Sequence, residues 1–187
     1  MSIQSQCVVC GDSQTIRVID KLKGKRFDID RCLNCGLEFL EPQPTREEIQ
    51  SIYSSDYYAP WDMRTGEHPA TGKMKRLTFK RRLSELSLEV DEGPVLDIGT
   101  ATGFFLDEVA ADPRYQPYRV EVSEYAGKIA QSEFGADPIR IGTIETAPFP
   151  EEFFSAVAMS DLIEHGQDPH PVVKCVHSLL RPRGGAR

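Results

Sequence analysis

The sequence predicts an α/β protein in which a small N-terminal β-hairpin precedes a doubly wound, mainly parallel sheet of about four to five strands. Short apolar runs alternate with helical patterns from residue 94 onward, which favours parallel strands joined by helices. A glycine-punctuated turn at residues 99–103 follows the first of these runs. Near the N-terminus, two Cys-x-x-Cys pairs flank strand-like alternation and indicate a separate small unit.

The turn after the first core strand carries the strongest functional signal. An apolar run ends in Asp97, glycines follow, and residues 104–111 have helical spacing. In doubly wound sheets, ligands lie beyond the carboxyl ends of the strands, where this turn is placed. A dinucleotide fingerprint would need glycines where the chain has Ala101 and Phe104, and no Gly-Lys-Ser/Thr motif follows. The pattern therefore favours an adenosine ligand with little or no phosphate.

The following segments extend the same pattern. Residues 118–122 are predicted to form a second strand that ends near Glu121, with a helix over residues 123–134. An acid about twenty residues past a glycine turn can accept hydrogen bonds from both ribose hydroxyls. The alternative for Glu121 is a solvated surface charge. Further strands are expected at 139–141 and 153–161, with a helix at 172–180.

Residues 94–183 resemble the class I S-adenosylmethionine (SAM) methyltransferases, which have a Rossmann-like sheet. The stretch 97–103 resembles their Asp/Glu-x-Gly-x-Gly-x-Gly motif, with alanine in place of the middle glycine. The stretch 161–165 resembles the Asp-x-x-Glu-His segment of ubiquinone-biosynthesis and small-molecule methyltransferases. The resemblance implies SAM as the cofactor. It implies cofactor contacts from Asp97, Gly99, Ala101, Gly103, Glu121, Thr143 and Ile144.

Two residues after the fourth strand are candidates for catalysis. The resemblance places Asp161 beside the methyl-transfer site. His165 lies just past the carboxyl end of the strand, and a neutral imidazole there can take a proton from the acceptor as the methyl moves. The alternative is that His165 is a structural histidine that caps the loop through hydrogen bonds.

Four of the five cysteines form two Cys-x-x-Cys-Gly turns. Four thiolates give the closed tetrahedral shell of structural Zn²⁺, which leaves no ligand position for catalysis. Disulfides and a redox pair are the alternatives, but no signal peptide is apparent, and a redox motif would open a helix. Strand-like alternation at residues 15–19 and 26–30 completes a zinc-ribbon hairpin. The predicted metal ligands are Cys7, Cys10, Cys32 and Cys35.

Three segments follow from these patterns: the zinc ribbon at 1–44, a helical linker and cofactor-covering helix at 45–92, and the methyltransferase-like core at 93–187. Within the linker, Thr45 and Glu48 predict a capping box for a short helix. A second helix is predicted over 73–89, with a recurring apolar side formed by Met74, Leu77, Leu83, Leu86 and Val90.

Compared with the resembled family, the core lacks its last strands, so we expect a C-terminally truncated core. Its exposed sheet edge would permit self-association. The formal net charge of −7 at pH 7 argues against general nucleic-acid binding. The sequence has no targeting segment and no long apolar run, so a cytoplasmic protein without membrane contact is expected.

The join of a cysteine ribbon to this type of core resembles bacterial zinc-ribbon methyltransferases of sugar, polysaccharide and natural-product pathways. That resemblance implies a small-molecule acceptor, including nucleotide-linked sugars. Two alternatives stay open. The chain could be a non-catalytic SAM-binding or partner-binding protein, or a nucleic-acid-modifying enzyme that docks through its ribbon.

Overall fold

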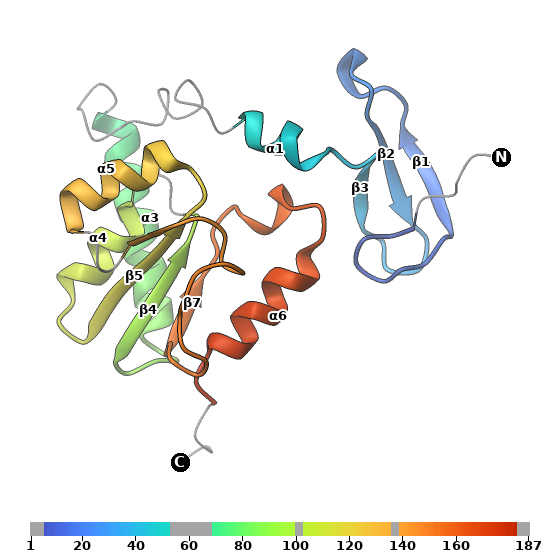
Figure 1. Ribbon diagram of the computed structural model, residues 1–187. Coiled ribbons are helices and arrows are strands. Elements are labelled where there is room, and N and C mark those ends of the chain that lie inside the picture. The colour runs from blue at the N-terminus through green and yellow to red at the C-terminus, as the bar shows by residue number, and fades with distance from the viewer. Residues whose placement is uncertain (1–5, 53–68, 100–102, 136–138, 183–187) are drawn as a thin grey trace. The chain divides into compact units, whose positions relative to one another are not determined.

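The computed structural model (Figure 1) describes residues 6–52, 69–99, 103–135 and 139–182 of the 187-residue chain. The chain divides into two compact units. Met1–Ile52 and Glu164–Pro171 form the first, and Tyr53–Ile163 and Val172–Arg187 form the second. Within the described ranges, every helix is too short or too polar to cross a lipid bilayer.

A three-stranded antiparallel sheet forms the N-terminal unit, in the order β1-β2-β3. The predicted hairpin is present, but its second strand begins two residues later than expected because a 3₁₀ turn lengthens the connection. The third strand was not predicted, because a four-residue segment shows too little alternation to stand out. The elements are β1 (Thr15–Ile19), η1 (Leu22–Gly24), β2 (Asp28–Cys32) and β3 (Glu38–Glu41).

The capping box predicted for the linker is confirmed at the start of α1 (Arg46–Ile52). The backbone N–H of Thr45 donates to Glu48 Oε2 at 2.7 Å, and the N–H of Glu48 donates to Thr45 Oγ1 at 3.1 Å. The Arg26 guanidinium also pairs with Glu48 and, together with the Thr45 N–H, lowers the pKa of that carboxyl. The start of this helix is thus tied to the hairpin connection of the same unit.

The second unit contains a parallel four-stranded sheet in the order β6-β5-β4-β7, which confirms the predicted Rossmann-like fold class. The second core strand begins three residues earlier than expected, and the fourth is reduced to three residues. The elements are α3 (Pro69–Leu86), β4 (Gly93–Ile98), α4 (Phe104–Ala111), β5 (Tyr115–Glu121), α5 (Glu124–Phe134), β6 (Ile139–Ile141), β7 (Ala156–Ala158), η3 (Ile163–His165) and α6 (Pro169–Leu179).

Alternate residues of β4 pack against opposite layers of helices. Val95 belongs to a core cluster with Phe105 of α4 and with side chains of α3. Leu96 belongs to a second cluster with Phe154 and with Val176 of α6. Figure 1 shows α3 and α4 on one side of the sheet and α6 on the other. The chain therefore changes faces between β4 and β7, and such a switch point is where doubly wound sheets bind their ligands.

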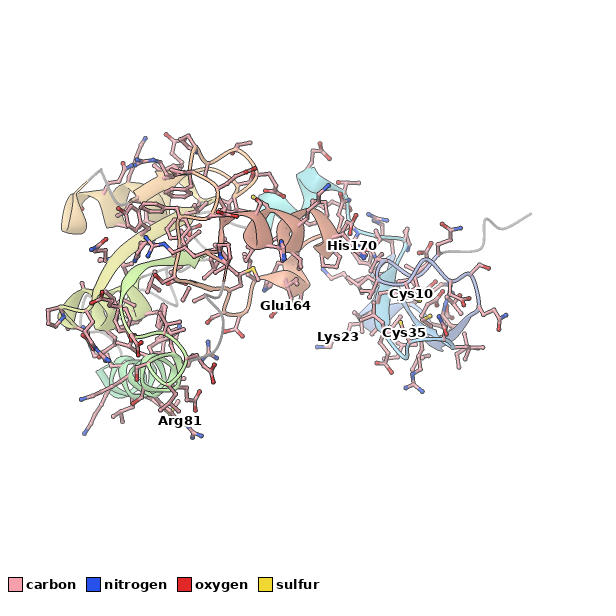
Figure 2. All side chains as sticks on the ribbon, turned by 90° about the horizontal axis from the view of Figure 1, so that it is seen from below. Cys10, Lys23, Cys35, Arg81, Glu164 and His170 are labelled. Carbon is pink, nitrogen blue, oxygen red and sulfur yellow. The ribbon has the colours of Figure 1, made fainter. Side chains whose placement is uncertain are left out.

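The apolar side predicted for the long linker helix is correct only in its second half. Leu83 is buried and Leu86 packs in the same cluster, whereas Met74 and Leu77 are 65% and 60% exposed. Phe79 takes their place and lies 5.9 Å from the ring of Phe105, centroid to centroid. Figure 2 shows Arg81, on the outer side of α3, projecting away from the sheet, where it pairs with Glu85.

Candidate cofactor site and metal centre

Two predicted cofactor residues, Asp97 and Glu121, meet at the carboxyl edge of the sheet. Asp97 is the penultimate residue of β4, and Glu121 is the last residue of the neighbouring strand β5. The N–H of Gly99 donates to the carbonyl oxygen of Val120 at 2.9 Å, so the turn after β4 starts beside Glu121. The structure thus brings the acid of the first strand, the glycine turn and the acid of the second strand together.

Backbone conformation explains the glycines at both ends of the turn. Gly99 has φ +75° and Gly103 has φ +76°, in the left-handed region that favours glycine. A Cβ on Gly99 would also lie 2.8 Å from Leu162 Cδ1, which is closer than normal packing permits. Ala101 lies outside the described residues. Helix α4 begins at Phe104, directly after the turn.

Asp97 is a buried carboxyl with an unusual electrostatic environment. It is 3% exposed, and its Oδ2 atom has no hydrogen-bond partner among the described residues. Burial raises its pKa to about 8, and the neighbouring Glu121 charge adds to this effect, whereas Arg119 and Arg82 oppose it. An unsatisfied buried acceptor is costly unless a ligand supplies a donor. The acceptor oxygen of Asp97 therefore fits an ammonium-bearing ligand such as SAM.

Glu121 is also buried, at 2% exposed, but its carboxylate is anchored. Its Oε1 accepts a hydrogen bond from the backbone N–H of Ser123 at 2.9 Å. Ser123 is the N-cap of α5, and its hydroxyl in turn accepts from the N–H of Ala126 at 3.4 Å. Glu121 is therefore not the solvated charge that was the alternative for it. A fixed carboxylate at this position fits a pair of ribose hydroxyls.

Arg119 is a member of this polar group that sequence patterns did not single out. It is 1% exposed and is paired in register with Asp97 across β4 and β5. Successive side chains of a strand point to opposite faces, so Arg119 and Glu121 share the face that carries Asp97. The available signal was an arginine two residues before Glu121 in a predicted parallel strand, because a buried parallel strand rarely holds charged residues.

The loop after β6 lies next to the same edge. The N–H of Gly142 donates to the carbonyl oxygen of Glu121 at 2.9 Å. Thr143, which follows, is exposed, whereas Ile144 is 3% exposed and packs in the core cluster on the α6 face. Their roles as adenine contacts stay predictions.

The two catalytic candidates have different settings. Asp161 is exposed and has φ +53°, a conformation that is uncommon for a residue with a side chain and that clusters at functional sites. Lys75 of α3 is near enough for the Asp161 charge to act on its pKa, which burial nevertheless lowers. His165 is exposed in η3 and belongs to the other unit, with Glu164–Pro171. A catalytic role for either residue stays a prediction.

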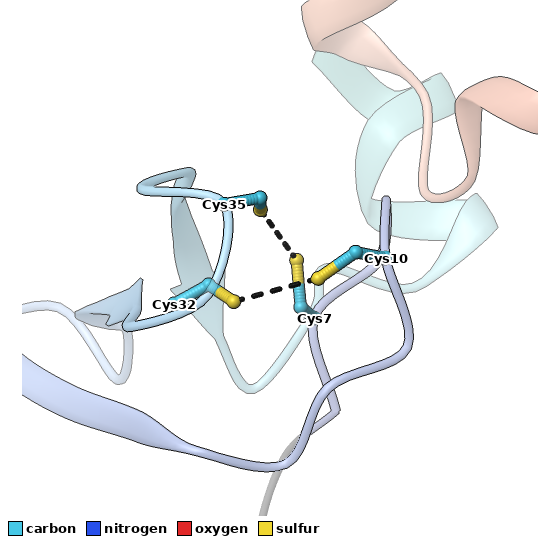
Figure 3. Close-up of side chains that lie close together, drawn as sticks. All are labelled: Cys7, Cys10, Cys32 and Cys35. Atoms are coloured by element: carbon cyan, nitrogen blue, oxygen red, sulfur yellow. Dashed lines mark hydrogen bonds between the residues drawn. The ribbon is translucent and has the colours of Figure 1, made fainter.

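The four predicted metal ligands converge in the N-terminal unit (Figure 3). Their sulfur atoms all lie within 4.8 Å of one another. Cys7 Sγ is 3.6 Å from Cys35 Sγ, and Cys10 Sγ is 3.5 Å from Cys32 Sγ. Zn–S bonds of about 2.3 Å in a tetrahedron separate the sulfurs by about 3.8 Å. The spacing and the all-sulfur donor set therefore fit Zn²⁺.

Matching turns produce this convergence. The N–H of Gly11 donates to the carbonyl oxygen of Cys7 at 2.9 Å, and the N–H of Gly36 donates to that of Cys32 at 3.0 Å. Both glycines have left-handed backbones, with φ +72° and +78°. In each turn the first cysteine is buried and the second is exposed. Among the described residues, Phe39 of β3 and the adjoining Leu37 are the further apolar side chains that pack with the buried pair.

Comparison with known proteins agrees with the fold of the second unit. Residues 96–186 match a family described as "Methyltransferase domain". A methyltransferase complex with the Trm112 activator from Haloferax volcanii is similar at 20% identity and TM-score 0.52, over 69% of this chain and 56% of that chain. A SAM-dependent methyltransferase from Thermotoga maritima is similar at 22% identity and TM-score 0.51, over 66% and 55%. No curated protein matches the chain.

Residues 96–186 are thus similar to a methyltransferase family, and the solved structures agree with the Rossmann-like fold of this unit. The chain spans about half the length of the solved structures it matches, from 47% to 58% among the first four.

Proposed function

We propose that the chain binds SAM at the carboxyl edge of β4 and β5 and transfers its methyl group to a small molecule. One observation carries the proposal: two buried carboxyls, Asp97 and Glu121, meet beside a turn that needs glycine at both ends. The unsatisfied Oδ2 atom of Asp97 adds to it, because it calls for a donor that the described residues do not supply.

The two acids at the carboxyl edge of the sheet would bind different parts of SAM. Asp97 would accept hydrogen bonds from the cofactor ammonium, and Glu121 would accept them from the ribose hydroxyls. Bound SAM supplies an electrophilic methyl on a cationic sulfonium. Methyl transfer then requires alignment, exclusion of water and, for a weak nucleophile, a base. We assign the acceptor side to Asp161 and the role of base to His165.

Calorimetry with SAM and S-adenosylhomocysteine (SAH) tests the cofactor assignment. Glu121→Gln keeps an acceptor for the N–H of Ser123 but removes the charge, so SAH binding should weaken about 10- to 100-fold, as expected for lost charge-assisted hydrogen bonds. Glu124→Gln is the matched control, because Glu124 is an exposed acid in the first turn of α5. Absence of binding by the wild type, or equal affinities for both variants, would refute the assignment.

For the acceptor we propose a small molecule of the sugar, polysaccharide-precursor or natural-product type, including nucleotide-linked sugars. The paired charges of the hairpin unit support this over nucleic acid, because Arg26 pairs with Glu48 and Arg31 pairs with Glu38. Transfer of labelled methyl from SAM to a panel of nucleotide-linked sugars, with RNA and DNA as separate arms, distinguishes these classes. Cofactor binding without transfer to any of them would favour a non-catalytic SAM-binding protein.

For the four-cysteine cluster we propose one structural Zn²⁺ per chain. A closed shell of four thiolates offers no position for a substrate, so the ion would stabilise the small sheet and take no part in methyl transfer. The geometry of the sulfur atoms supports this assignment.

A further inference from the structure

Arg119 is the largest of the fully buried side chains in the described part of the chain. Two of its neighbours on the same face of the sheet are acidic. Asp97 is directly opposite it on β4, and Glu121 is two residues further along β5. A row of acid, guanidinium and acid therefore crosses the carboxyl edge, where the apolar packing of Val95 with α4 ends.

The charges in this row are unequal in number. One guanidinium faces two carboxyls, and burying a charge without a partner is far more costly than burying a paired one. The charged groups that act on Asp97 are Arg119 and Glu121 from β5 and Arg82 from α3. Because burial and the Glu121 charge together outweigh both arginines, the pKa of Asp97 rises to about 8, so Asp97 holds its proton at neutral pH and the Glu121 charge is the one left near the guanidinium.

We propose that Arg119 is a positioning residue: its guanidinium fixes the two carboxyls of the cofactor edge and keeps Glu121 ionised, so that Glu121 can accept two ribose hydroxyl hydrogen bonds. The proposal rests on the proposed function for its role in binding, but the electrostatic action of Arg119 on the two acids is independent of any ligand. Arg119 would not touch the reacting atoms.

The action on the acids is tested without cofactor, by unfolding of the full chain. Arg119→Met leaves the buried Glu121 charge without this cation, so its thermal midpoint should fall well below that of the wild type at pH 7.5. Adding Glu121→Gln removes that charge, so the double variant should recover at least half of the loss. If the Arg119→Met variant does not fold, a double variant that does fold counts as the recovery. No recovery would overturn the proposal.

The role in binding is tested by SAH affinity between pH 6 and pH 9. Arg119→Lys keeps the positive charge and should bind within about 10-fold of the wild type. In Arg119→Met the carboxyl pKa values rise, so affinity should be lost at pH 6 and should recover more steeply with pH than in the wild type. Arg114→Met is the matched control, because Arg114 is an exposed arginine paired with Asp112.

The possible failures are distinguishable. A wild type that does not bind SAH overturns the proposed function, while the rescue experiment still tests the action of Arg119 on the acids. An Arg119→Met variant that folds and keeps the wild-type pH profile of SAH binding overturns the positioning role. A purely structural arginine would shift the thermal midpoint but not that profile.

Discussion

Loss of metal from the four-cysteine cluster is expected to unfold the N-terminal sheet while the α/β unit stays folded. The sheet has three strands of four to five residues, and its buried apolar cluster consists of Phe39 and two of the cysteines themselves. So small a core cannot support a stable fold alone. Structural zinc contributes roughly 10–16 kcal/mol of apparent binding free energy in such units.

Hydrogen exchange read by mass spectrometry measures this effect by segment. With chelator, or in Cys32→Ser, protection of backbone amides over residues 15–41 should be lost, whereas protection of β4 and β5 should persist. Cys175→Ser is the matched control, because Cys175 lies on α6 outside the cluster. Metal analysis should give one zinc per chain for the wild type and this control. A protein purified without chelators that is free of metal but keeps the sheet protected would contradict the assignment.

Replacement of Asp97 by asparagine is expected to stabilise the α/β unit at alkaline pH and to weaken SAM binding. The unfolded chain releases the Asp97 proton near pH 3.8, whereas the folded unit holds it until about pH 8. Between these values the folded state binds more protons, so its unfolding free energy falls as pH rises. The cost of ionising the buried Asp97 carboxyl is therefore absent below pH 3.8 and complete above about pH 8.

The magnitude follows from the size of the pKa shift. One pKa unit corresponds to about 1.4 kcal/mol, so Asp97 should cost the wild type on the order of 6 kcal/mol at pH values well above 8. Between pH 6 and pH 8 the wild type should lose about 2–3 kcal/mol from this residue. Asp97→Asn carries no such titration and should show a correspondingly flatter dependence.

Exchange rates of amides in β4 and β5, followed from pH 6 to pH 8.5 and corrected for intrinsic exchange, report this difference. Asp107→Asn makes the same chemical change on α4, where Asp107 is half-buried and paired with Arg76, and serves as control. Equal pH slopes for wild type and Asp97→Asn would disprove the linkage. We thus expect Asp97→Asn to gain stability and to lose affinity for SAM. Such a trade-off is expected where a buried charged group is retained to bind a ligand.

Local signals in the sequence predicted the elements whose cause is also local. The turn after β4 needs left-handed residues, and glycine marks them. The start of α1 depends on a side chain three residues away, so Thr45 and Glu48 reveal it. The two cysteine turns are likewise predictable from their Cys-x-x-Cys-Gly sequences. Each of these features is decided within a few residues of chain.

Features decided by contacts between distant segments were missed or misplaced. Strand β3 forms because it pairs with β2 and covers the buried cysteines. Its four residues alone do not predict these contacts. The buried side of α3 is set by contact with α4. The pattern correctly included Leu83, but it also chose Met74 and Leu77, whereas the structure packs Phe79 against α4.

The candidate site shows the same division. Asp97, Gly99, Gly103 and Glu121 were predictable because each ends a strand or shapes a turn. Arg119 was not, because its importance comes from the register of β5 against β4, which places it opposite Asp97. Strand register over a parallel pair depends on the whole sheet, not on any single segment.

The close approach of Gly99 to Leu162 links two loops that a protein engineer would wish to alter separately. Any side chain at position 99 must displace Leu162, the neighbour of Asp161. A substitution at position 99 would therefore also shift the loop that follows β7. To keep that loop in place, it calls for a paired substitution with a smaller residue at position 162.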